Sequence, residues 1–251
     1  MDRLLDEIES YWSTRTEGYS EVNEKELKGM QKKAWLKTLE SGFLEKKLSD
    51  NDKEQLRILD IGTGPGFFPM ILAEAGYHVT AVDYTPGMLE KAAENAAKFI
   101  GEKSSNIEFK RMDAQALEFE DESFDVIISR NLTWTLPHVS HAYKEWIRVL
   151  KKGGVLLNFD ANYGKADFSN VSDLPETHAH HTVGDEMMRE CEEIKRQLPI
   201  SSYSRPAWDL ETLGAMNLEE FQVDLGISSR IYLEKDAFYN PTPMFMLRTR
   251  K

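Results

Sequence analysis

A glycine-rich turn between two short apolar stretches is the feature that most constrains this chain. Residues 56–61 form the first apolar stretch, three glycines stand within residues 62–66, and residues 78–82 form the second stretch, which ends in Asp83. Short, nearly continuous apolar runs are typical of strands buried on both faces of a parallel sheet. Residues 67–76 between them predict a helix. The segment therefore predicts a strand, a glycine turn, a helix and a second strand.

The acid that ends the second strand indicates a ribose-binding cofactor site. Its two oxygens can accept hydrogen bonds from both ribose hydroxyls, so a nicotinamide or flavin dinucleotide and S-adenosylmethionine both suit Asp83. The dinucleotide fingerprint Gly-x-Gly-x-x-Gly needs its third glycine where this chain has Phe67. The glycine comes one residue earlier, at Gly66, and the carboxylate of Asp60 before the turn suits an ammonium group better than a pyrophosphate. This pattern favours S-adenosylmethionine.

The pattern Asp60-x-Gly62-x-Gly64-x-Gly66, followed by Asp83, resembles motifs I and II of the class I S-adenosylmethionine-dependent methyltransferases. The likeness is to the type that acts on small molecules, as in ubiquinone biosynthesis. It implies an α/β fold with a doubly wound, Rossmann-like, seven-stranded mixed sheet whose last strand is antiparallel. It also implies an N-terminal helical lid and an insertion before the last two strands.

These parts divide the chain into three regions. We expect the helical lid in residues 1–50, the cofactor-binding core in residues 51–163 and 217–251, and a substrate-covering insertion in residues 164–216. Within the outer regions, periodic apolar residues predict a helix over 24–40 and a helix over 185–197.

The resemblance implies a set of cofactor contacts. An apolar side chain, Met88, would lie on the adenine face, while Asp113 and the backbone of Ala114 would bind the adenine edge. Tyr19 and Arg130 would approach the methionine carboxylate, although Arg130 could instead bind an acidic substrate or lie on the surface. The full expected set is Tyr19, Asp60, Gly62, Thr63, Gly64, Gly66, Asp83, Tyr84, Met88, Asp113, Ala114, Arg130 and Asn131.

The expected reaction is in-line displacement of the cofactor's methyl group by a small-molecule acceptor, leaving S-adenosylhomocysteine. The loop after the fourth strand should border the reacting methyl, which places Asn131 and Trp134 nearest to it. A hydroxyl or ammonium acceptor would benefit from a base, and His138 and His178 are candidates. A soft or deprotonated acceptor would need none, so the sequence fixes no catalytic base.

A cluster of three histidines, His178, His180 and His181, raises the question of a metal site. Adjacent side chains point apart in regular structure, and no carboxylate or cysteine is spaced to complete a zinc site. Arg130 also stands where a magnesium-dependent methyltransferase would need an acid. We therefore predict a solvated polar loop and no metal.

Composition limits the remaining alternatives. The 251-residue chain has a formal net charge of −12, which disfavours nucleic acid as a partner. It has no apolar run long enough for a membrane span, and its one cysteine, Cys191, fits a cytoplasmic protein. The sequence leaves open whether the protein is a monomer or a homodimer. Two other functions stay open: a nicotinamide-dependent oxidoreductase, and a non-catalytic regulatory protein that binds S-adenosylmethionine.

Overall fold

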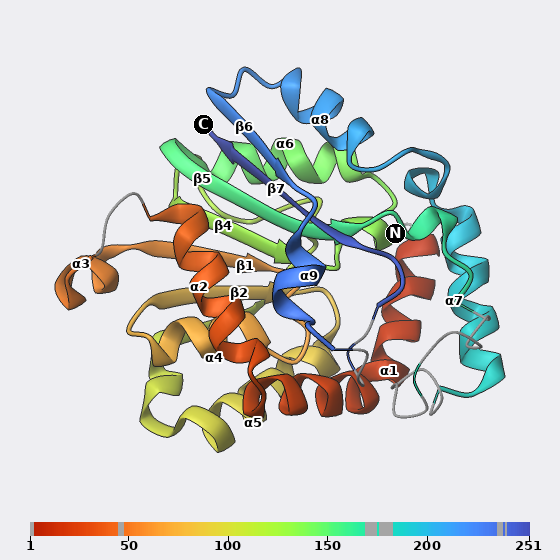
Figure 1. Cartoon of the computed structure of the whole chain (residues 1–251), viewed down its shortest axis with the longest axis horizontal. Helices are drawn as coiled ribbons and strands as arrows, with labels where there is room; N and C mark the ends of the chain where they lie inside the picture. Colours follow the sequence, from red (N-terminus) through yellow and green to blue (C-terminus); the bar gives the residue numbers. More distant parts are fainter. Residues whose placement is uncertain (1–2, 45–47, 169–174, 176–182, 235–237, 239) are drawn as a thin grey trace.

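A seven-stranded sheet forms the centre of the computed structural model, which describes residues 3–44, 48–168, 175, 183–234, 238 and 240–251 (Figure 1). The strand order is β3-β2-β1-β4-β5-β7-β6. β1 to β5 are parallel, whereas β7 is antiparallel to both β5 and β6. The predicted doubly wound mixed sheet with an antiparallel last strand is therefore confirmed. The strands are β1 (Arg57–Ile61), β2 (His78–Asp83), β3 (Ile107–Arg111), β4 (Phe124–Arg130), β5 (Leu150–Ala161), β6 (Glu220–Asp224) and β7 (Met244–Arg250).

The central strands are buried on both faces. Along β1, Ile58 packs into one apolar cluster and Leu59 into the other, and Val126 and Ile127 of β4 alternate in the same way. This alternation follows from the two-residue period of a strand. The cluster around Ile58 contains side chains of α2 (Gln31–Phe43), α4 (Phe67–Glu74) and α9 (Ile227–Ile231), and the cluster around Leu59 those of α6 (Val139–Val149) and α8 (Ala207–Gly214).

The N-terminal region contains one long helix, α1 (Arg3–Lys28), before α2 begins at Gln31. The prediction of one continuous helix over residues 24–40 is therefore wrong, because α1 ends at Lys28 and a turn at Gly29–Met30 separates it from α2. The buried face of α1 includes polar residues, among them Ser20 and Glu26, and an apolar pattern could not reveal it. In Figure 1, α1 lies beside α7 (Asp185–Gln197) at one side of the sheet.

Polar contacts fasten this long helix to the core. The amide of Asn95, in α5 (Pro86–Ile100), donates to the Ser20 hydroxyl at 3.0 Å and to the Pro65 carbonyl at 3.1 Å. One buried side chain thus joins α1 to the glycine turn. None of the helices in the described ranges is long and apolar enough to cross a membrane.

The C-terminal part differs from expectation in one element. The sequence over residues 221–232 predicts one of the last two strands, but β6 ends at Asp224 and α9 follows. The side chains of Ile227 and Ile231, four residues apart, are both buried against the sheet, which is helical spacing. The predicted helix over residues 185–197 coincides with α7, and a short α3 (Asp50–Gln55) precedes β1.

Candidate functional site

A cavity lies where β1, β2 and β4 end, beneath α1. Because parallel strands present their carboxyl ends at one edge, this is the place where a doubly wound sheet binds ligands. The residues that line it are Leu5, Ile8, Glu9, Trp12, Tyr19, Ile61, Gly62, Gly64, Val82, Asp83, Tyr84, Thr85, Met88, Met112, Asp113, Ala114, Arg130, Asn131, Leu132, Thr135 and Leu136.

The glycine turn forms one wall of the cavity. Gly62 and Gly64 have φ angles of +71° and +52°, in the left-handed region that favours glycine. The backbone N–H groups of Gly62 and Thr63 donate to the Val82 carbonyl, and that of Gly64 donates to Asp83. The turn therefore presents glycine Cα atoms to the cavity, while these three N–H groups tie it to β2.

Two polar atoms at the base of this turn are buried and have no hydrogen-bond partner among the described residues: Oδ2 of Asp60 and Oγ1 of Thr63. Burial raises the pKa of Asp60 from 3.8 to about 7, although the nearby Thr63 hydroxyl and the charge of Arg130 act in the opposite direction. A buried carboxylate oxygen without a hydrogen bond is costly. Asp60 and Thr63 are therefore suited to bind a cationic ligand group. Asp60, Thr63 and Gly66 do not themselves line the cavity.

Asp83 is fixed at the cavity wall by backbone donors. Its Oδ2 accepts from the N–H of Gly64 at 2.8 Å, and its Oδ1 accepts from the N–H of Thr85 at 2.9 Å. Burial raises the pKa of this carboxyl, and the two backbone donors partly offset that effect. Each carboxylate oxygen keeps a further lone pair, so both remain able to accept from a ligand hydroxyl.

Another part of the cavity lining combines apolar and carboxylate groups. Met88 and Ala114 line the cavity and are almost fully buried. Oδ1 of Asp113 accepts from the backbone N–H of Gln115 at 2.8 Å and from its side-chain amide at 3.1 Å. Tyr84 also lines the cavity. Thirteen cofactor contacts were predicted, and the structure brings ten of them to one cavity: Tyr19, Gly62, Gly64, Asp83, Tyr84, Met88, Asp113, Ala114, Arg130 and Asn131.

The lid helix α1 closes the cavity. The ring of Tyr19 lies 3.7 Å from the position that a Cβ atom on Gly64 would occupy, so it faces the turn directly. Trp12 packs edge-to-face on Tyr19 with ring centroids 5.7 Å apart. Three further lining residues on α1 were not identified from the sequence: Leu5, Ile8 and Glu9. The spacing of Leu5 and Ile8 indicates a helix but not a cavity.

Arg130 lies in an aromatic and acidic cage at the end of β4. Its guanidinium is 3.1 Å from the Glu26 carboxylate and within 5.3 Å of the ring centres of Trp35, Phe67 and Phe68. Burial is the largest single influence and lowers the pKa of Arg130, but Glu26, Tyr232 and Tyr19 together hold that pKa above its ordinary value. Arg130 is therefore a buried residue with an internal partner, not a surface arginine. The sequence carried no signal for Glu26.

The four candidates for catalysis are distributed differently. Asn131 lines the cavity with a left-handed φ of +56°, and its Oδ1 accepts from the Tyr163 hydroxyl at 3.2 Å. Trp134 stands behind it, with its indole N–H donating to the Asn131 carbonyl at 2.9 Å. His138 is exposed and outside the cavity lining, and its backbone N–H donates to Gln115. His178, His180 and His181 lie outside the described residues.

No cluster of three or more histidine, cysteine, aspartate or glutamate side chains is placed to hold a metal in the part of the chain that the structure describes. Asp160, at the end of β5, is fully buried and engaged with protein donors. Its carboxylate is thus committed to internal contacts.

Comparison with known proteins identifies the family to which this chain is related. Residues 59–158 match the family described as "Methyltransferase domain". A demethylmenaquinone methyltransferase of Leptospira interrogans is 31% identical over 180 residues, which cover 68% of each chain. The ubiquinone/menaquinone biosynthesis C-methyltransferase UbiE of Zymomonas mobilis is 32% identical over 133 residues, 53% of this chain and 54% of that one.

Coverage of other relatives is smaller. The chain spans between 25% and 54% of the length of three curated relatives, the UbiE protein among them.

In fold, the chain is similar to a solved S-adenosylmethionine-dependent methyltransferase of Methanococcus maripaludis, with a TM-score of 0.60, 17% identity, and coverage of 95% of this chain and 93% of that chain. The predicted family and its cofactor are confirmed, and the chain belongs to the class I S-adenosylmethionine-dependent methyltransferases.

Proposed function

We propose that this protein transfers a methyl group from S-adenosylmethionine to a small-molecule acceptor. One observation carries the proposal: a backbone-fixed acid, Asp83, lines the cavity at the end of β2, and a buried acid with an unpartnered oxygen, Asp60, lies near the end of the neighbouring strand β1, beneath the glycine turn. Asp60 suits an ammonium group and Asp83 a ribose diol, and S-adenosylmethionine contains both. When bound, it supplies a methyl group activated by a sulfonium.

The lining residues would divide the cofactor between them. Asp83 would accept from the ribose hydroxyls, and Met88 would cover the adenine, with Asp113 and Ala114 at its edge. Asp60 and Thr63 would receive the ammonium group. Tyr19 and Arg130 are proposed to face the carboxylate, since Tyr19 lies over the glycine turn and Arg130 is the one lysine or arginine among the described residues that line the cavity.

The chain's own contribution to the reaction would be alignment. No histidine is among the described residues that line the cavity. Holding an acceptor against the methyl group at near-contact distance and excluding water supply a large part of the acceleration without a base. We therefore propose an acceptor that is soft or already deprotonated. Asn131, at the cavity wall, is the residue proposed to lie nearest to the reacting atoms.

The acceptor is proposed to be a small molecule and not a nucleic acid. The chain's formal charge of −12 opposes a polyanion, and the relatives named above act on small molecules by their names. A cytoplasmic location is part of the same proposal, on the basis of the single cysteine.

Calorimetric titration of the purified protein with S-adenosylmethionine, S-adenosylhomocysteine and a reduced nicotinamide nucleotide tests the proposal. Binding of the first two with micromolar dissociation constants, and none of the third, is the expected result. Binding of the nicotinamide alone would establish the oxidoreductase alternative. A screen of acceptors with labelled methyl then separates an enzyme from a non-catalytic binder.

A further inference from the structure

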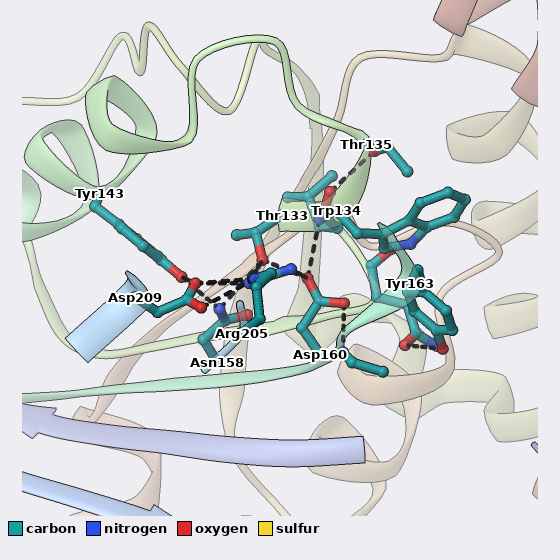
Figure 2. A network of polar contacts seen from close by, with 12 residues as sticks. Thr133, Trp134, Thr135, Tyr143, Asn158, Asp160, Tyr163, Arg205 and Asp209 are labelled. Carbon is teal, nitrogen blue, oxygen red and sulfur yellow. Dashed lines mark hydrogen bonds and ion pairs between the residues drawn. The ribbon is translucent and has the colours of Figure 1, made fainter. Parts of the chain in front are cut away.

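A buried network of charged and hydroxyl side chains joins the segment before α8 to the carboxyl end of the sheet. Figure 2 shows Arg205 lying between Asp209 and Asp160. Its Nη1 donates to Asp160 at 2.9 Å, its Nη2 donates to Asp209 at 2.7 Å, and both acids are fully buried. Behind Asp209, the Tyr143 hydroxyl donates to its carboxylate at 2.6 Å. Arg205 thus forms ion pairs with two carboxylates, one in β5 and one in α8.

The inner acid of this network holds the turn that follows β4. Oδ2 of Asp160 accepts from the backbone N–H of Trp134 at 3.0 Å and from the hydroxyl of Thr133. Arg205 also reaches that turn directly, because its Nη2 donates to the Thr133 hydroxyl at 2.6 Å. Thr133 is fully buried and lies in a single 3-10 turn, Thr133–Thr135 (η2). Asp160 and Arg205 therefore fix both the backbone and the side chain of η2.

The same turn forms a wall of the cofactor cavity. Leu132, Thr135 and Leu136 line it, as does Asn131, whose carbonyl accepts from the indole of Trp134. Asn131 has a left-handed backbone, a conformation that asparagine tolerates better than most residues with a side chain, and the indole of Trp134 holds its carbonyl there. An unbroken set of contacts thus runs from Arg205 through Asp160 and Trp134 to Asn131.

A buried ion pair is weak evidence for stability, because desolvation cancels much of its attraction. A satisfied polar network does, however, favour one geometry over its alternatives. We propose that Arg205 is a positioning residue for the cofactor site: through Asp160 and Thr133 it holds residues 131–136 in the shape that binds S-adenosylmethionine. This inference rests on the proposed function for the identity of the ligand, while the geometry of the turn can be tested without it.

The decisive comparison is between variants that disturb the two ends of the network. Arg205→Lys keeps the positive charge but loses the planar guanidinium that donates to Asp160 and Asp209 at the same time. Thr133→Val removes one hydroxyl next to the cavity. Tyr143→Phe is the matched control, since it removes one hydroxyl on α6 that reaches Thr133 only indirectly, through Asn158 or through Asp209 and Arg205. Thr133→Ser restores the hydroxyl. Each protein is titrated with S-adenosylhomocysteine, and amide hydrogen exchange is followed over residues 131–136 in the ligand-free state.

We expect Arg205→Lys and Thr133→Val to weaken binding roughly tenfold, about the net contribution of one hydrogen bond, and to speed exchange in the turn. Tyr143→Phe and Thr133→Ser should stay within about twofold of the wild type, even where Tyr143→Phe lowers the melting temperature. Equal affinities for Thr133→Val and Tyr143→Phe would overturn the proposal. If Arg205→Lys does not fold, the two threonine variants still decide it.

Failure of the proposed function gives a different result. Wild-type protein that binds neither S-adenosylmethionine nor S-adenosylhomocysteine would contradict the proposed ligand. The exchange data then decide the positioning role alone: faster exchange over residues 131–136 in Arg205→Lys supports it, and unchanged exchange overturns it.

Discussion

The guanidinium of Arg130 and the carboxylate of Glu26 form a buried ion pair, 3.1 Å apart, between the end of β4 and the lid helix α1. The Tyr232 hydroxyl donates to the same carboxylate at 2.9 Å. The sheet, the lid and α9 therefore meet at one acid. Because Arg130 also lines the cavity, this pair links the position of the lid to the cofactor site.

Glu26→Ala should destabilise the protein by about 3–5 kcal/mol, because it leaves the Arg130 guanidinium buried without its counter-charge. Glu24→Ala, on the same helix, removes partly exposed pairs with Lys98 and Lys28 and should cost about 0–1 kcal/mol. Chemical denaturation of both variants measures the difference. Similar losses for the two would show that the buried pair has no special role in holding α1.

The same variant tests whether Arg130 receives the cofactor carboxylate. With Glu26 absent, a ligand carboxylate would supply the missing charge, so S-adenosylhomocysteine should raise the melting temperature of Glu26→Ala more than that of the wild type. Methylthioadenosine, which lacks the amino acid group, should show no such excess. An equal rise with both ligands would place the carboxylate elsewhere.

The cofactor half of the fold could be predicted from sequence because its signals are local. Gly62 and Gly64 directly follow the first apolar strand and allow the left-handed backbone of the turn. Asp83 ends the second apolar strand. The buried pairs could not be predicted. Glu26 and Arg130 are 104 residues apart, and Asp160 and Arg205 are 45 apart, so no local pattern links them. The buried face of α1 also carries polar residues, Ser20 and Glu26 among them, so an apolar pattern could not reveal the full length of this helix.

Asp83→Ala should weaken binding of S-adenosylhomocysteine by about 1–3 kcal/mol, the loss expected for hydrogen bonds to a charged acceptor. The Asp125 carboxylate is a matched control: it accepts from the backbone N–H of Arg57 at 3.0 Å, at the opposite end of the strands. Asp125→Ala should leave affinity unchanged. Calorimetry on both variants checks this, and an unaltered dissociation constant for Asp83→Ala would remove Asp83 from the ribose site.

Gly64→Ala should reduce cofactor affinity far more than it reduces stability. A Cβ atom at Gly64 meets only the Tyr19 ring, at ordinary contact distance, but it projects into the cavity wall. Gly153→Ala is the control, since Gly153 has a φ of +74° and open space around its Cβ position. Both substitutions carry the cost of a left-handed alanine, roughly 1 kcal/mol. Binding and unfolding measured together separate the two effects, and equal affinities would exclude close approach of the ligand to Gly64.

Asp60 should make both stability and binding depend on pH. Its pKa is about 7 in the folded protein because burial penalises the charge, against 3.8 as the ordinary value. The folded state therefore holds a proton that the unfolded state releases above about pH 4, and the resulting stability is complete below that pH and lost as pH rises through 7. Between these values each pH unit should cost up to about 1.4 kcal/mol. The melting temperature of the cofactor-free protein should fall over this range, and that of Asp60→Asn should fall less.

Binding of the cofactor should show the opposite dependence. An ammonium group favours the ionised carboxylate, so affinity for S-adenosylmethionine should increase as pH rises through about 7, where Asp60 loses its proton. Asp60→Asn cannot ionise and should show a flat profile, and methylthioadenosine, which has no ammonium group, should show one with the wild type. Calorimetric dissociation constants across this pH range make the comparison. If affinity for S-adenosylmethionine is as flat in the wild type as in Asp60→Asn, then Asp60 does not receive the ammonium group, and the unpartnered Oδ2 must have another role.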